Sequence, residues 1–139
     1  MSISAGIKKA MWILGSIVVG ELALAVLTTI AQEVIFDGIG YNESPFWELL
    51  VGGILTVLAA IGAGWIARKI IRKRRLIIPL GIAVLILIES YYLVFIRGSD
   101  QPLWFEMLAV LSLIFGIWFG FYLPDLNHAI SIKEQKERL

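Results

Sequence analysis

Four long apolar stretches constrain this chain more than any other feature of its sequence. They cover residues 10–31, 46–67, 76–96 and 103–123. Each is close to the ~20 residues that an α-helix needs to cross a ~30 Å hydrocarbon core. None shows the ~10-residue alternation of apolar and polar residues that a membrane β-barrel requires. Because backbone groups in lipid must be hydrogen-bonded within the segment, the sequence predicts four membrane-spanning helices.

The overall composition excludes an ordinary water-soluble domain. Apolar residues make up 59% of the chain and charged residues 17%, against about 45–50% and about 25% in globular domains. A soluble fold of 139 residues has too little interior to hide so much apolar surface. A bilayer removes this difficulty because it solvates the apolar side chains directly.

The connections between the four stretches are short: residues 32–45, 68–75 and 97–102. Pro45 and Pro102 stand where the following helix would begin, a position that suits proline because its φ is preset and it lacks an N–H. Short links make successive spans antiparallel. We therefore expect one membrane domain over residues 1–139, with a polar tail at 124–139. Its predicted fold is all-α: a four-helix transmembrane bundle with up-down-up-down topology, built from two antiparallel hairpins.

Lysine and arginine residues are distributed very unevenly along the chain. Eleven of the twelve lie before the first span, between the second and third spans, or in the tail, and only Arg97 lies on the other side. The positive-inside rule then places the N- and C-termini in the cytoplasm. The sequence thus predicts a multi-pass protein of the cell membrane, of the kind found in the bacterial inner membrane.

A basic turn joins the second and third spans. Its six cations are Arg68, Lys69, Arg72, Lys73, Arg74 and Arg75. Beside a membrane, such a turn attracts anionic lipid headgroups at about 1 kcal/mol per residue. It has no interleaved aromatic residues to stack on bases, which argues against nucleic-acid binding. We expect the turn to fix the orientation of the protein and to contact lipid.

Carboxylates gather on the opposite side of the membrane: Glu33, Asp37, Glu43, Glu48, Asp100 and Glu106. Solvated side chains at helix ends account for this pattern. A face that attracts cations or a basic partner is the alternative.

Two glutamates lie inside the predicted spans, where an ionisable side chain costs at least about 2.5–3.5 kcal/mol. Glu21 is near the middle of the first span, and Glu89 is slightly beyond the middle of the third. If the two carboxyls meet, they can share one proton or chelate a cation, and they then titrate as a pair. The alternative is two separately satisfied glutamates. The candidate polar partners are then Thr56 or Ser112 for Glu21, and Ser90, Tyr91 and Tyr92 for Glu89.

Small residues recur at helical spacing in two of the spans. The second span carries Gly52, Thr56, Ala60 and Gly64, and the fourth carries Ser112, Gly116 and Gly120. Stripes of small residues let helix backbones approach closely. They are expected to pack the helices of one chain together, and a homodimer or another membrane protein is the alternative partner.

Several classes of function are disfavoured. The chain contains no cysteine, which excludes disulfides, thiolate metal sites and cysteine nucleophiles. Its single histidine, His128, excludes a multi-histidine haem or zinc site within one chain. The spans contain no Ser–His pair, paired aspartates or cluster of metal ligands. We therefore expect no catalytic, metal-binding or cofactor-binding residues and no enzymatic activity.

The sequence leaves two hypotheses of function. The first is a non-enzymatic structural, accessory or interaction component of the membrane. The second is a small proton- or cation-coupled transporter that works as a dimer through Glu21 and Glu89. In its four spans and the glutamate of the first span, the chain resembles the small multidrug-resistance transporters. This resemblance extends to no further motif, and the chain is not assigned to that family.

Overall fold

The computed structural model describes residues 3–71 and 76–123, and within these residues all regular secondary structure is helical. The prediction of an all-α chain with four helices is confirmed. The first and third helices each continue into a π-helix. The elements are α1 (Ile3–Thr29), η1 (Ile30–Val34), α2 (Phe46–Ile70), α3 (Ile77–Tyr91), η2 (Tyr92–Gly98) and α4 (Leu103–Tyr122).

All four helical segments are long and apolar enough to cross a membrane. The second, third and fourth lie within a few residues of the predicted spans. The first is longer than expected, since the helix extends through Lys8 and Lys9 at one end and through η1 at the other. A charged residue near the end of a span need not end the helix, because its long side chain can reach the interface.

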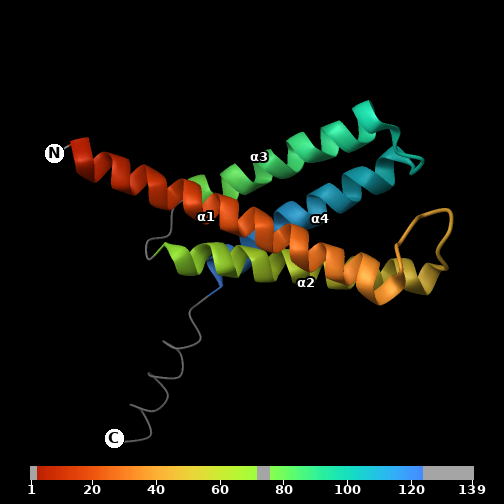
Figure 1. Cartoon of the computed structure of the whole chain (residues 1–139). Coiled ribbons are helices and arrows are strands. Elements are labelled where there is room, and N and C mark those ends of the chain that lie inside the picture. The colour runs from red at the N-terminus through yellow and green to blue at the C-terminus, as the bar shows by residue number, and fades with distance from the viewer. Residues whose placement is uncertain (1–2, 72–75, 124–139) are drawn as a thin grey trace, which may run out of the picture.

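The helices form two antiparallel hairpins, α1–α2 and α3–α4, that cross and diverge toward their loops (Figure 1). Helix α2 packs mainly against α1 and α4, and α3 packs against α1 and α4. We call the end that carries Lys8, Lys9, Arg68 and Lys69 the basic end. We call the opposite end, with residues 35–45 and 99–102, the acidic end. Each half of the bundle is named after its end.

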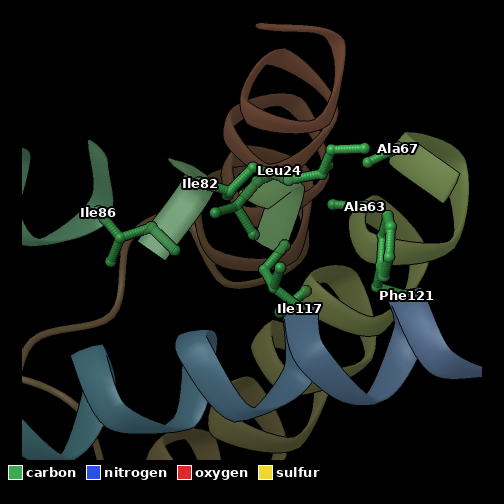
Figure 2. Close-up of a cluster of buried hydrophobic side chains, with 9 residues drawn as sticks. Leu24, Ala63, Ala67, Ile82, Ile86, Ile117 and Phe121 are labelled. Carbon is green, nitrogen blue, oxygen red and sulfur yellow. The ribbon is translucent and has the colours of Figure 1, made fainter. Parts of the chain in front are cut away.

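The basic half is packed around one apolar cluster, shown in Figure 2. Leu24 of α1, Ile82 and Ile86 of α3, and Ile117 and Phe121 of α4 meet Ala63 and Ala67 of α2. The buried Ser16 hydroxyl donates a hydrogen bond to the Ala67 carbonyl and ties α1 to α2. Ile78, Ile82, Ile117 and Phe121 have no exposed surface. All four helices therefore contribute to one core.

Helices α2 and α4 are in backbone contact in the basic half. A Cβ added to Gly64 would collide with the Ile117 carbonyl, and one added to Gly120 would collide with the Ile61 carbonyl. At Gly116 an added Cβ would lie 2.6 Å from the Cβ of Ala60. The small residues at these positions thus pack helices within one chain.

At the acidic end, the loop between α1 and α2 reaches across to the start of α4. Its tight turn uses positive φ angles at Asp37 and Gly38, 55° and 93°. The Tyr41 amide donates to Gln101 Oε1 at 2.8 Å, and the Tyr41 ring packs edge-on against Trp104 with 5.3 Å between centroids. The two hairpins are therefore joined at both ends.

Candidate functional site

Glu21 and Glu89 are brought together on the α1–α3 side of the bundle. Gly20, which precedes Glu21 on α1, packs against Ile82 of α3, so α1 and α3 are in contact next to Glu21. The Glu21 side chain is half-buried and the Glu89 side chain is exposed. Their carboxyl groups lie close enough to interact directly. We call these two residues the acid pair.

The hydroxyl groups expected to satisfy Glu21 bond elsewhere. Thr56 donates to the Gly52 carbonyl at 2.8 Å and accepts from Gln32 Nε2 at 3.2 Å. Ser112 donates to the Ala109 carbonyl of its own helix at 2.7 Å. Glu21 Oε2 is buried and has no hydrogen-bond partner in the part of the chain that the structure describes.

The hydroxyl groups next to Glu89 do not surround it either. Tyr91 and Tyr92 are exposed, and the Tyr91 ring packs against Phe95 with 5.1 Å between centroids. Ser90 is partly buried. Over residues 3–71 and 76–123, none of these three side chains forms a hydrogen bond with the Glu89 carboxyl, although the Tyr92 backbone amide donates to the Glu89 carbonyl. Among the residues that the structure describes, the side-chain partner of each carboxyl is thus the other carboxyl.

Through Glu89, the acid pair is exposed on the outside of the bundle. Two carboxylates side by side repel each other in a medium of low dielectric constant. One bound proton, a cation, or a positively charged group from outside would relieve this repulsion. No cluster of three or more His, Asp or Glu residues able to hold a metal ion occurs among the described residues.

A second feature, which sequence reasoning missed, is a groove of about 480 Å³ between α2 and α4 in the acidic half. Its walls are mostly apolar, and its polar groups belong to Gln32, Thr56 and Ser112. Neither member of the acid pair lines it. Thr56 and Ser112, predicted as packing residues, line this groove, and Gly52 lies beneath the Ile39 side chain.

The basic turn is described only in part. Arg68 is partly buried and Lys69 is exposed, with Lys69 Nζ 4.2 Å from the centroid of the Trp65 ring. Residues 72–75, which carry the other four predicted lipid-contacting cations, lie outside the described residues, as do His128 and the rest of the tail at 124–139.

The comparisons with known proteins do not supply a function for this arrangement. The chain matches no protein-family model, no curated protein and no solved structure.

Proposed function

We propose that this chain is a non-enzymatic accessory component of a membrane, which binds a helix of another membrane protein on its α1–α3 face. The acid pair is the observation that carries this proposal. The partner helix would present a lysine or arginine at the depth of Glu21 and Glu89. The positive-inside rule would place the basic end, and with it both termini, in the cytoplasm.

The proposal is supported by the free-energy cost of exposing the acid pair to lipid, which a partner would reduce. Acidic side chains in spans usually face a bundle interior or a water-filled cavity, and they pair with other groups. Glu89 faces neither, because its side chain is exposed on the outside of the bundle. The described spans hold no cation near it: Lys8, Lys9, Arg68, Lys69 and Arg97 all lie at span ends. A cation from outside the chain would complete the pair.

A designed membrane peptide that carries the required cation tests this proposal directly. The full chain is reconstituted in liposomes with a leucine helix of about 20 residues that carries one lysine at its centre. We expect energy transfer between labels on the two molecules, and no transfer above background with an all-leucine peptide. The double variant Glu21→Gln/Glu89→Gln should lose most of this association.

The matched control is Glu106→Gln, at the acidic end of α4. Glu106 accepts a hydrogen bond from Ser99 and lies away from the α1–α3 face, so this variant should bind the peptide as the parent does. Equal binding of the lysine and all-leucine peptides, or full binding by the Gln/Gln variant, would contradict the proposal.

The adjacency of the two carboxyls favours a second candidate, a proton- or cation-coupled transporter. Two neighbouring carboxyls can share one proton or hold a cation between them. Glu89 is exposed on this side, so a second copy would have to cover the α1–α3 face to enclose a path. Proteoliposomes loaded with a pH-sensitive dye should then show proton flux, and Glu21→Gln should abolish it. Unchanged flux in that variant would exclude this candidate.

A further inference from the structure

The groove between α2 and α4 follows from how closely these helices meet elsewhere. Gly64, Gly116 and Gly120 bring the two backbones into contact in the basic half. Helices that cross at an angle move apart on leaving their closest approach. In the acidic half the separation leaves a space of about 480 Å³, and the small residues Gly53 and Ala109 are among those that line it. The groove is thus a direct consequence of the tight crossing.

The groove opens sideways, toward the bilayer. Leu50, Ile54, Leu58 and Leu108 line it and are more than half exposed. At the acidic end, Ile39 of the loop also lines it, and Tyr41 packs against the lining residue Phe105 with 5.3 Å between centroids. The loop therefore covers the end that faces water, and the side that faces lipid stays open.

The size of the groove suits a single apolar ligand. Sites for small molecules typically enclose about 300–1,000 Å³, and this groove encloses about 480 Å³. The hydroxyls of Thr56 and Ser112 already donate to backbone carbonyls. The lining therefore offers mainly apolar surface to an occupant.

Carboxylates near the acidic end of the groove would select among amphiphiles. Glu48 does not line the groove, but it lies on α2 one turn before Gly52 and two turns before Thr56, which do. It therefore lies on the same stripe of α2, just beyond the acidic end of the groove. Glu106 lies at the same end of α4, and Glu43 lies in the covering loop. An anionic headgroup near these carboxylates would be repelled, whereas an ammonium group would be attracted.

We propose that this groove holds one acyl chain of a bilayer lipid whose headgroup is zwitterionic and carries an amine. The chain lies between α2 and α4, and the ammonium group lies beside Glu48. This site is on a different pair of helices from the acid pair, so the inference is independent of the proposed function.

Gly53 provides a way to fill the groove without disturbing the helices. It lines the groove, and a Cβ added there would have no neighbour within 4 Å. Gly15 on α1 has equally open surroundings and is far from the groove. Gly53→Phe is therefore the test variant, and Gly15→Phe is its matched control.

The experiment uses photoactivatable lipids. The full chain is reconstituted in liposomes that contain phosphatidylethanolamine with a diazirine in one acyl chain, or phosphatidylglycerol with the same chain. After illumination, mass spectrometry locates the crosslinks. We expect the amine lipid to label residues 49–58 and 105–112, and to do so about fivefold more than the anionic lipid. Glu48→Gln should remove most of this preference.

Labelling of these two segments should fall severalfold in Gly53→Phe and remain at the parent level in Gly15→Phe. Ala109→Leu, which fills the groove from the α4 side, should reduce the labelling to a similar extent. A thermal-unfolding measurement on each variant shows that the fold is kept. Undiminished labelling in both filled variants, or equal labelling by the amine and anionic lipids, would overturn the proposal.

Discussion

The two halves of the α2–α4 pair use similar residues to opposite effect. In the basic half, Gly64, Gly116 and Gly120 are buried under the backbone of the facing helix. In the acidic half, Gly53 faces open space and Ser112 lines a groove. A small residue permits close approach without enforcing it. What decides the outcome is the distance of the residue from the point where the helices cross.

The two halves also differ in what they contribute: the basic half to stability and the acidic half to the candidate binding groove. The basic half contains the shared core and the buried Ser16 hydrogen bond. The acidic half contains the groove, both π-helices and the loop that spans the hairpins. Substitutions in the basic half should therefore change the free energy of unfolding, while matched substitutions in the acidic half should leave it almost unchanged.

The largest effect is expected at Gly120. Gly120→Leu would place a side chain where the Ile61 carbonyl lies. We expect a loss of about 3 kcal/mol, the upper end of the usual cost of overpacking, because a helix backbone cannot move aside as a side chain can. Gly53→Leu in the acidic half should change stability by less than about 0.5 kcal/mol. Unfolding in mixed micelles by SDS titration, followed by circular dichroism, measures both. Equal losses in the two variants would show that the halves do not differ.

A smaller effect is expected from truncating an apolar side chain. Phe121 is completely buried, and Phe121→Ala should cost about 2–3 kcal/mol, below the usual range in soluble cores because lipid is itself apolar. Leu108→Ala, at a position that is 62% exposed, should cost less than about 0.5 kcal/mol, since lipid refills the space. The same titration compares them, and a larger loss for Leu108→Ala would contradict the assignment of the core to the basic half.

The smallest effect concerns a single hydrogen bond. Ser16→Ala removes the bond between α1 and the Ala67 carbonyl and should cost about 0.6 kcal/mol, the average for interhelical hydrogen bonds in membranes. Ser112→Ala removes a bond within one helix and should cost less. If the two losses are the same, the Ser16 bond contributes nothing specific to the pairing of α1 and α2.

Hydropathy and charge predicted most of the fold. The apolar stretches give the four helices, and Pro45 and Pro102 mark where α2 and α4 begin. The helix-to-helix contacts of Ala60, Gly64, Gly116 and Gly120 follow from the spacing of small residues. These features are local, so a single stretch of sequence contains the information that determines them.

The candidate sites were harder to predict from the sequence because they depend on distances between helices. Because Glu21 and Glu89 lie at similar depths, a contact between them was one of two alternatives. Depth does not determine how each helix is rotated about its axis, so it could not decide between them. For the same reason, Thr56 and Ser112 were expected as partners for Glu21, whereas both line the groove. The groove itself is set by a crossing angle, for which no local pattern exists.

The π-helices at the acidic end have a consequence for how this chain can vary in length. Helices α1 and α3 both finish as π-helix, in η1 and η2. A π turn contains more residues than an α turn, so either segment can lose one residue and close up as α-helix. In α2 or α4 the same deletion would rotate the rest of the helix by about 100° and turn Gly64 or Gly116 away from its contact. Natural variants that differ by one residue in length are therefore expected at η1 and η2.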